Sequence, residues 1–366
     1  MQMTFRWYGE GNDPIPLSHI KQIPGVTGLV WALHDVPVGE VWPMDRILEV
    51  KGQAEKAGFN IDVVESVNVH EDIKLGLPSR IQLIENYKQT IRNLAQVGVK
   101  VICYNFMPVF DWTRTDLFKE LPDGSNALFF EKAKTVDVDV TEVFDRITQG
   151  SKGFTMPGFE PEKRPLILNL FEQYKGMTEE KMFENLKFFL DAIIPTCEEC
   201  DIKMAIHPDD PPWDIFGLPR LIKSEKNIQK FLDLNPSPYN GLTLCSGSLG
   251  SGTENDVAAI IRKFHDRIHF AHIRNVKHFD NGDFIECSHR SCDGDVDIAD
   301  VVKAYHEVGF KGYCRPDHGR HIWGEEAHCR PGYGLYDRAL GIMYMWGVWD
   351  ALEQAQQRLG NIKTSA

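Results

Sequence analysis

Short apolar runs rich in β-branched and aromatic residues recur along the chain and alternate with longer segments whose apolar positions follow a helical period. Runs of the first kind predict strands, and segments of the second kind predict amphipathic helices. Eight strands are expected, at residues 3–8, 28–33, 61–65, 100–104, 203–206, 241–245, 268–273 and 312–315. Helices are expected at residues 44–57, 80–97, 179–200, 227–234, 255–265, 297–308 and 336–359.

Several of the expected helices have recognisable ends. Thr178 can cap the helix that follows it, and Gly58, Gly98 and Gly309 lie where a helix would turn back toward a strand. Eight strands that alternate with helices, without an evident linker, favour a closed (β/α)₈ TIM barrel over an open doubly wound sheet. We therefore expect one α/β barrel domain over residues 1–366.

The stretch from about residue 108 to 174 interrupts this alternation. Aromatic, charged and glycine residues mix there, with short helical patches expected only at 127–134 and 140–148. The stretch is longer than an ordinary connection between a strand and a helix, so we interpret it as an insertion after the fourth strand. An insertion at that point lies on the face that carries the carboxyl ends of the strands. Its role is therefore either a lid over the active site or a dimerisation arm.

Composition and charge narrow the classes of partner. The chain has a formal net charge of -13 and no evident basic patch, which disfavours nucleic acid and anionic membrane surfaces. The most apolar run, residues 188–195, is broken by Asp191 and Pro195, so no membrane span is expected. Eight thinly spread cysteines and the lack of a signal-peptide core at the N-terminus favour a reduced, cytoplasmic enzyme.

Four consecutive expected strands finish on residue types that bind metals. These residues are His207, Cys245, His272 and Asp317. A single His or Cys at a strand end is more often a buried structural residue. Four in register on neighbouring strands of a barrel favour a divalent metal site that keeps positions open for substrate. On ligand softness alone, a set with one thiolate would favour Zn²⁺ over Mn²⁺ or Fe²⁺.

Further candidates for chemistry lie near this rim. His318 follows Asp317, and neighbours at a strand end point in different directions, which favours an acid–base role for His318 over a fifth ligand. Tyr333 lies between two glycines before the last helix, where it is either presented to the rim or structural. His34 ends the second strand and is either a pocket residue or an ordinary loop histidine.

The combined motifs resemble the mannonate dehydratase family of hexuronate catabolism. The stretches that carry the resemblance are IHPDDPP (206–212), LCSG (244–247), HIRN (272–275), RPDHGR (315–320) and PGYG (331–334). The resemblance extends from RWYG (6–9) to the last helix, without a departure at the positions named above.

The resemblance implies a xylose-isomerase-like TIM barrel that dehydrates D-mannonate to 2-keto-3-deoxy-D-gluconate. The reaction implied is abstraction of the C2 proton and acid-assisted loss of the 3-hydroxyl. It further implies a homodimer or higher homo-oligomer and a divalent metal, usually Mn²⁺, with Fe²⁺ or Co²⁺ as alternatives, in place of the zinc that softness favours. Carried over by motif, the metal ligands are His207, Cys245, His272 and Asp317, and the catalytic pair is His318 and Tyr333.

The implied dehydration reaction suggests a role for each of these residues. We expect His318 to act as the base and Tyr333 as the acid. Arg274 and Arg315 are candidates for holding the substrate carboxylate or for fixing the metal ligands, and ion pairing on the rim is an equal alternative. Asp209 is expected to orient His207. The competing functions are a metal-dependent sugar isomerase or epimerase on the same barrel and a non-catalytic sugar-acid-binding protein.

Overall fold

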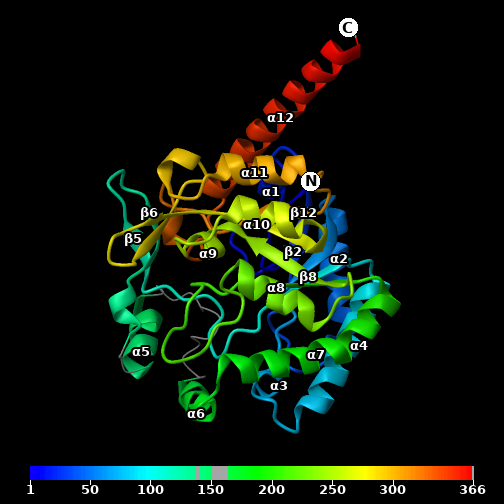
Figure 1. Cartoon of the computed structure of the whole chain (residues 1–366), viewed down its shortest axis with the longest axis vertical. Coiled ribbons are helices and arrows are strands. Elements are labelled where there is room, and N and C mark those ends of the chain that lie inside the picture. Colours follow the sequence, from blue (N-terminus) through cyan, green and yellow to red (C-terminus); the bar gives the residue numbers. More distant parts are fainter. Residues whose placement is uncertain (137–139, 151–163, 365–366) are drawn as a thin grey trace.

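Eight parallel strands close into a barrel in the part of the chain that this computed structural model describes, residues 1–136, 140–150 and 164–364 (Figure 1). Each predicted strand overlaps an observed one, and the predicted (β/α)₈ barrel is confirmed. In order round the ring, the strands are β1 (Gln2–Arg6), β2 (Val26–Trp31), β3 (Asn60–Glu65), β4 (Val101–Tyr104), β7 (Lys203–Ile206), β8 (Asn240–Cys245), β9 (Ile268–Ile273) and β12 (Tyr313–Pro316).

The barrel strands are apolar because helices cover their outer faces and side chains fill the interior. Strands β8 and β9 are buried at every position, as is usual for parallel strands covered on both sides. A separate cluster that includes Val30, Val101 and Phe270 draws residues from several strands and fills the barrel interior. The ring centroid of Phe270 lies 4.5 Å from that of His272, so this cluster is a floor beneath the candidate site.

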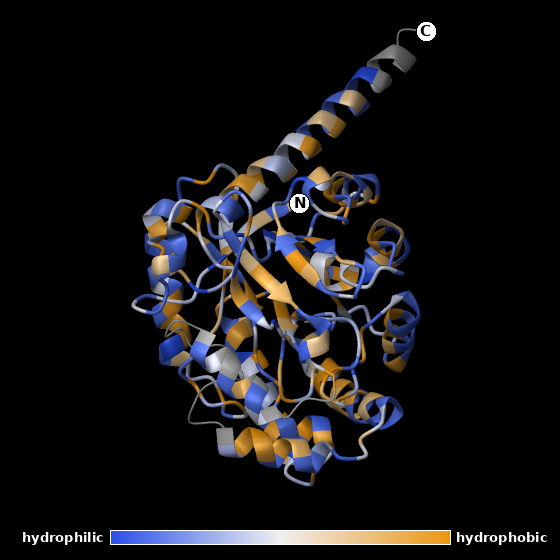
Figure 2. Cartoon of the chain, turned by 90° about the vertical axis from the view of Figure 1, so that its left-hand side faces the viewer, coloured by the Kyte–Doolittle hydropathy of each residue, from blue (hydrophilic) through white to orange (hydrophobic). Residues whose placement is uncertain are grey.

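Helices surround the barrel with their apolar sides turned inward. Figure 2 shows blue and orange on different sides of several of these helices. Their bounds are α1 (Leu17–Ile20), α2 (Met44–Lys56), α3 (Glu71–Leu75), α4 (Arg80–Gln96), α5 (Val140–Gly150), α6 (Arg164–Tyr174), α7 (Glu179–Cys200), α8 (Glu225–Leu234), α9 (Ser246–Gly250), α10 (Val257–Phe264), α11 (Ile298–Glu307) and α12 (Tyr336–Thr364). Short 3₁₀ turns are η1 (Lys132–Lys134), η3 (His265–Arg267), η4 (Ser291–Asp293) and η5 (Glu325–Ala327).

The ends of these helices follow the capping residues in the sequence. Thr178 accepts a hydrogen bond from the backbone N–H of Lys181, as predicted for the start of α7. Asp256 caps α10 in the same way, through the backbone N–H of Ala259. The C-terminal half of α12 extends away from the barrel (Figure 1).

A second, antiparallel sheet lies beside the barrel, with the strand order β10-β11-β6-β5. It joins β5 (Asp116–Glu120) and β6 (Asn126–Phe130), which follow β4, to the hairpin of β10 (Asn275–His278) and β11 (Phe284–Cys287), which follows β9. We call it the accessory sheet. Two distant segments therefore meet at one side of the barrel rim.

Part of the expectation for residues 108–174 is wrong. A helical patch was expected at 127–134, but strand β6 occupies its first half and only η1 turns helically. The run of apolar residues from Ala127 to Phe130 is short and rich in aromatics, which suits a strand paired with β11. The helix expected near 140–148 is present as α5. The rest of the predicted insertion includes residues 137–139 and 151–163, which lie outside the described residues.

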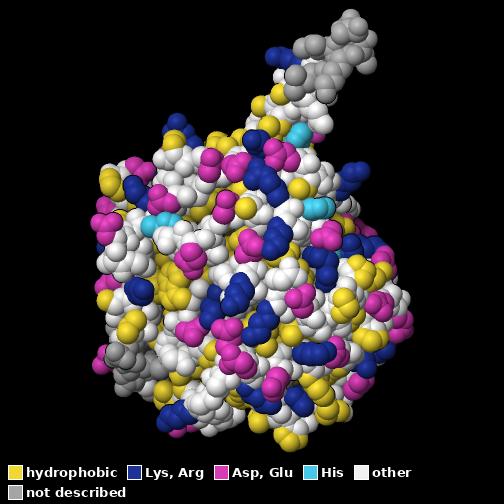
Figure 3. Space-filling model, in the orientation of Figure 1, with side chains coloured by type: hydrophobic (Ala, Val, Ile, Leu, Met, Phe, Trp, Pro, Cys, Tyr) yellow, Lys and Arg dark blue, Asp and Glu magenta, His cyan; other side chains and the backbone are white. Residues whose placement is uncertain are grey.

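The surface carries both signs of charge. Figure 3 shows Lys and Arg side chains interspersed with Asp and Glu over the face drawn. Within the described residues, every helix is too short or too polar to cross a bilayer.

Candidate active site

The carboxyl ends of four adjacent barrel strands carry His207, Cys245, His272 and Asp317. Cys245 on β8 is in register with His272 on β9, and the other two residues follow directly after β7 and β12. One ligand-type atom from each of the four lies within 4.8 Å of those of the other three. The structure thus brings together all four residues that the sequence predicted as metal ligands, and we call them the rim cluster.

The chemistry of the rim cluster fits a divalent transition metal. His207 Nε2 lies 3.2 Å from His272 Nδ1, and Cys245 Sγ lies 3.3 Å from Asp317 Oδ2. Cys245 and His272 are fully buried, and Asp317 is 3% exposed. Two imidazole nitrogens, a thiol and a carboxylate that face one point form the mixed donor set typical of such ions.

Asp317 is ionised at neutral pH. Burial alone would raise its pKa, but the neighbouring His318, Arg315 and Arg274 hold the pKa well below its usual range. Arg315 Nη1 lies 3.0 Å from Asp317 Oδ1, and Arg274 Nε lies 3.0 Å from Oδ2. The carboxylate is therefore in the state that a metal ligand needs.

Two polar groups of Ser248 face the sulfur of Cys245. The backbone N–H and the hydroxyl of Ser248 approach its Sγ at 3.4 and 3.1 Å. Ser248 lies in the short helix α9, which begins directly after Cys245. These contacts help to hold the Cys245 side chain toward the rim cluster.

Arg315 links the rim cluster to Glu65, a residue that the sequence reasoning missed. Arg315 donates to the two carboxylate oxygens of Glu65 at 2.9 and 2.7 Å. Glu65 Oε2 also lies 3.4 Å from His272 Nε2, on the side of the ring away from His207. A carboxylate behind a metal-binding histidine commonly fixes the ring and its tautomer. Glu65 ends strand β3, so its position after an apolar run was the available signal.

Arg274 makes the corresponding link on the other side of the rim. It is fully buried, and its Nη2 donates to Asp210 Oδ2 at 2.6 Å. Asp210 also accepts two hydrogen bonds from Arg114, at 2.8 and 3.0 Å. Both Arg274 and Arg315 thus pair with Asp317, and each also pairs with a second carboxylate.

The expectation that Asp209 orients His207 is wrong. The Asp209 carboxylate accepts from the backbone N–H groups of Leu221 and Ile222 at 2.9 and 2.6 Å, so it holds a neighbouring loop. His207 instead places its Nδ1 2.7 Å from the carbonyl oxygen of Pro208. Successive side chains point to opposite sides of the extended chain, and it is the next residue, Asp210, that joins the network around the rim cluster.

His318 and Tyr333 form a pair beside the rim cluster. His318 Nε2 lies 3.1 Å from the Tyr333 hydroxyl, and both residues are buried. Burial raises the pKa of Tyr333 well above its usual range, so its hydroxyl keeps its proton at neutral pH. The Trp112 ring packs against His318 with a centroid separation of 4.9 Å. The two predicted acid–base residues are therefore within hydrogen-bond distance of each other.

Glu286 on β11 lies behind His318. Its Oε1 is 3.0 Å from His318 Nδ1. Burial alone would raise the pKa of this carboxyl, but the neighbouring His318, Arg274 and Arg114 lower it to about 2. Glu286 was also missed by sequence reasoning, because it lies in a short polar hairpin whose strands were not expected.

His34 lies at the open edge of this region. Its Nε2 is 3.4 Å from Arg6 Nη2, and its ring centroid is 5.3 Å from that of Tyr8. The Tyr8 ring in turn packs edge-on against Tyr333 at 5.1 Å. His34 is exposed, so this edge is open to solvent.

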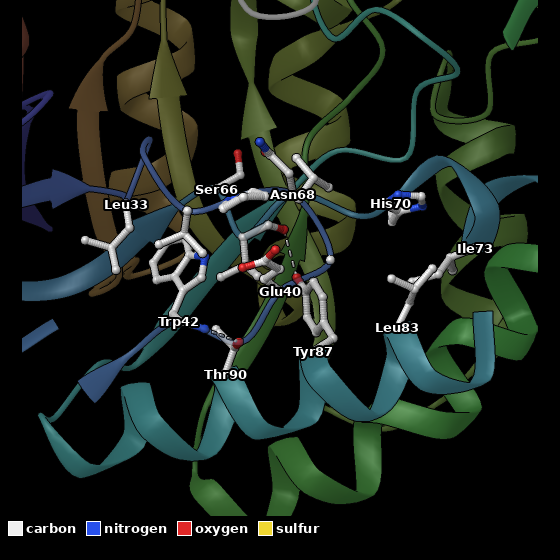
Figure 4. A pocket seen from close by; sticks show the side chains of 15 residues that line it. Leu33, Glu40, Trp42, Ser66, Asn68, His70, Ile73, Leu83, Tyr87 and Thr90 are labelled. Atoms are coloured by element: carbon white, nitrogen blue, oxygen red, sulfur yellow. Dashed lines mark hydrogen bonds between the residues drawn. The ribbon is translucent and has the colours of Figure 1, made fainter. Parts of the chain in front are cut away.

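A separate hollow lies between the loops after β2 and β3 and helix α4 (Figure 4). Leu33, Trp42 and Leu83 line it together with polar groups that already have partners. For example, the Tyr87 hydroxyl donates to the carbonyl oxygen of Val67, and the Trp42 backbone N–H donates to Thr90. None of its described lining residues belongs to the rim cluster or to the His318–Tyr333 pair, so the hollow is distinct from the candidate site.

The fold and the site define a class of protein: a (β/α)₈ TIM barrel with a metal-compatible cluster on its rim. A xylose isomerase domain protein from Planctomyces limnophilus has this fold, with a TM-score of 0.55 over 96% of this chain and 99% of that one. At 9% identity this likeness shows the fold alone.

Closer comparisons give the family. The D-mannonate dehydratase (UxuA) family model matches residues 1–359. The mannonate dehydratase of Shouchella clausii is 65% identical over 98% of this chain and 99% of its own length, and that of Endomicrobium trichonymphae is 63% identical over 97% of each. The crystal structure of mannonate dehydratase from Streptococcus suis has a TM-score of 0.88 at 46% identity, over 97% of this chain and 96% of that one. The chain belongs to the D-mannonate dehydratase family, whose members are hydro-lyases.

Proposed function

We propose that this chain catalyses the metal-dependent dehydration of D-mannonate to 2-keto-3-deoxy-D-gluconate, a step of hexuronate catabolism. The names of its relatives support the substrate. The proposed dehydration is supported chiefly by the His318–Tyr333 pair beside the rim cluster. The reaction takes a proton from C2 and a hydroxyl from C3, so a base and an acid must act on adjacent carbon atoms.

His207, Cys245, His272 and Asp317 would hold the metal ion in this proposal. We expect Mn²⁺, with Fe²⁺ or Co²⁺ as alternatives. When bound, the ion supplies positive charge that stabilises the negative charge developing on the substrate oxygens as C2 loses its proton. Arg274 and Arg315 act through Asp317, which they hold from both sides.

His318 is the base, acting through Nε2. Its Nδ1–H donates to Glu286, which leaves Nε2 without a hydrogen and therefore able to take the C2 proton. Tyr333 is the acid, because its raised pKa keeps the phenol protonated until it passes the proton to the departing 3-hydroxyl. The hydroxyl then leaves as water, and the enol that remains tautomerises to the keto acid.

The 3.1 Å contact between the two residues completes the proton balance. After one turnover, His318 carries an additional proton at Nε2 and Tyr333 lacks its own. Transfer from Nε2 to the phenolate oxygen returns both groups to their starting states. The cycle consumes no further proton donor or acceptor.

His34 is the proposed substrate contact at the open edge of the site. It is exposed, and it lies beside Tyr8, whose ring packs on Tyr333. An imidazole there can exchange hydrogen bonds with the hydroxyls of a sugar acid. We do not assign a substrate contact to Asp209, because its carboxylate accepts hydrogen bonds from the backbone of Leu221 and Ile222.

The segment of about residues 108–174 is proposed to cover the C-terminal face of the barrel. Trp112 and Arg114, from its described part, support this, since Trp112 packs on His318 and Arg114 pairs with Asp210. The alternative role as a dimerisation arm predicts that its deletion changes the oligomeric state and leaves turnover per site unchanged.

We also propose a cytoplasmic location and a homodimer or higher homo-oligomer. All eight cysteines lie within the described residues and are unpaired, which suits a reducing compartment. Trp323, Tyr336, Leu340 and Met343 expose large apolar surfaces near the start of α12, which suits contact with a second copy. Light scattering coupled to size exclusion gives the mass of the assembly.

The experiment that tests the function is incubation of the purified protein with D-mannonate. Formation of the 2-keto acid is followed with and without chelator, with Mn²⁺, Fe²⁺, Co²⁺ and Zn²⁺ added back separately. We expect keto acid that depends on the metal. Interconversion of sugars without keto acid would favour an isomerase or epimerase, and binding of mannonate without product would favour a non-catalytic sugar-acid-binding protein.

A further inference from the structure

We propose that Glu286 is a positioning residue for His318, and that Arg114 holds Glu286 in place from the segment after β4. This inference rests on the proposed function, since it concerns the base of that reaction. It also gives the accessory sheet, which lies outside the barrel and the rim cluster, a role in the reaction.

The Glu286 carboxylate is the point at which two guanidinium groups and the His318 imidazole meet. Its Oε1 lies 3.0 Å from His318 Nδ1, and it accepts from Arg114 Nη2 at 2.7 Å and from Arg274 Nη1. Glu286 is fully buried, as are both arginines. Its other oxygen, Oε2, has no hydrogen-bond partner among the described residues. The contact to His318 is therefore made by an oxygen whose position two guanidinium groups fix.

This contact sets the orientation of the imidazole. With Nδ1–H donating to Glu286, Nε2 is the nitrogen without a hydrogen and points to the Tyr333 hydroxyl. The Trp112 ring, 4.9 Å from the imidazole centroid, packs against the same residue. Without a carboxylate at this position the two tautomers of neutral His318 compete, and one of them places a hydrogen on the nitrogen that has to act as the base.

The sheet that carries Glu286 is built from two parts of the chain. Strand β11 pairs with β6, in the register of Phe284 with Phe130 and of Ile285 with Phe129. Arg114 precedes β5 of the same sheet. The segment after β4 therefore supplies both the strand that supports β11 and the guanidinium that holds its carboxylate.

If the charge of Glu286 is removed, Arg114 and Arg274 each keep another carboxylate partner. Arg114 and Arg274 both also pair with Asp210, at 2.8 and 2.6 Å. Glu286→Gln keeps the size of the side chain, so the substitution removes chiefly the anionic acceptor of His318. Asp283→Asn is a matched control. The Asp283 carboxylate is also buried, and it accepts a hydrogen bond from the Lys132 backbone N–H at 2.7 Å. It therefore stabilises the same region of the chain without contacting His318.

The test compares kcat, KM and metal content in these variants. We expect Glu286→Gln to lower kcat by roughly 10²–10⁴-fold, as loss of the carboxylate behind a catalytic histidine does elsewhere. KM for D-mannonate should change by less than about threefold, with metal content unchanged, because the lost interaction acts on the base and not on substrate binding. Asp283→Asn should retain the kcat of the parent protein.

A double substitution separates positioning from a merely structural role. If Glu286 acts through His318, adding Glu286→Gln to His318→Asn lowers the residual rate no further. Multiplied losses, or full kcat in Glu286→Gln alone, overturn the proposal. Should Glu286→Gln not fold, Glu286→Asp keeps the charge but withdraws it from His318, and an unchanged kcat in that variant also overturns the proposal.

A spectroscopic readout keeps the inference testable apart from activity. In protein with ¹⁵N-labelled histidine, the His318 signals are assigned by their loss in His318→Asn. They should report a single tautomer protonated at Nδ1 in the parent and a mixture in Glu286→Gln. A single tautomer in both proteins refutes the positioning role, even if the parent makes no keto acid from D-mannonate and the proposed function itself fails.

Discussion

Asp317 and His318 are consecutive residues whose side chains join different groups. Asp317 Oδ2 lies 3.3 Å from Cys245 Sγ within the rim cluster, whereas His318 Nε2 lies 3.1 Å from the Tyr333 hydroxyl. The two side chains approach each other to 3.9 Å. The stretch directly after β12 therefore contributes both to the rim cluster and to the acid–base pair.

The acid–base pair can be removed without disturbing the rim cluster. We expect His318→Asn and Tyr333→Phe each to reduce turnover by at least roughly 10²–10⁴-fold, since each removes one proton-transfer step. Metal content measured by plasma mass spectrometry should stay near one ion per chain, as in the parent protein. Full turnover in either variant, or loss of the metal from His318→Asn, would contradict the division of roles.

Cys245 offers a direct test of the metal site. Cys245→Ser should weaken metal binding by more than the roughly 10–100-fold that loss of an outer partner causes, because a ligand itself is changed. In the Co²⁺-loaded protein, the thiolate charge-transfer absorption should disappear. Cys292→Ser is the control, because Cys292 is exposed and outside the rim cluster. An unaltered Co²⁺ spectrum in Cys245→Ser would remove this residue from the proposed ligand set.

Glu65 should affect metal binding through His272. Glu65→Gln removes the charge 3.4 Å from His272 Nε2 and one partner of Arg315, so we expect metal affinity to fall by roughly 10–100-fold. At saturating metal, kcat should recover most of its parent value. Asp62→Asn, on the same strand β3, serves as the control. Equal metal affinity in Glu65→Gln and the parent protein would show that the carboxylate does not orient the imidazole.

Glu286 makes the stability of the metal-free protein depend on pH. Its pKa is about 2 in the folded chain against an ordinary value of 4.5, so its ionised form stabilises the fold above about pH 4.5, and this contribution is lost as the pH falls toward 2. The excess stability of the parent over Glu286→Gln should therefore shrink by about 2 kcal/mol between pH 6 and pH 3. Urea unfolding followed by circular dichroism measures both proteins. A difference that stays constant with pH would contradict the lowered pKa.

The alternation of apolar runs and amphipathic segments was sufficient to predict the barrel. The ends of its last four strands were sufficient to predict which side chains meet in the rim cluster, because neighbouring parallel strands finish on the same rim. Both inferences depend on local sequence and a regular topology.

What the sequence did not predict lies where distant segments meet. Strands β10 and β11 are short and partly polar. They are held in place because β11 pairs with β6, a strand more than 140 residues earlier in the chain, with Phe284 opposite Phe130. Glu286 and Arg114 have no local pattern that marks them as a pair. Their ion pair depends on this long-range sheet, and removal of either partner would leave a buried charge with one partner fewer.

The error at Asp209 has a different origin. The IHPDDPP stretch contains two consecutive aspartates, and composition does not distinguish which of them faces the rim. The backbone direction after His207 decides this, and it turns Asp210 toward Arg274 and Asp209 toward Leu221.

The pairing of β12 with β1 has a consequence for biosynthesis. Thr4 donates its side-chain hydrogen bond to the carbonyl oxygen of Cys314, 310 positions away, so the first strand has no partner on this side until the last strand has left the ribosome. Asp317, His318 and Tyr333 all follow in that final stretch. A nascent chain therefore holds an exposed strand edge and an incomplete site through most of its synthesis, and ring closure depends on contacts of very high sequence separation, the kind that slow folding.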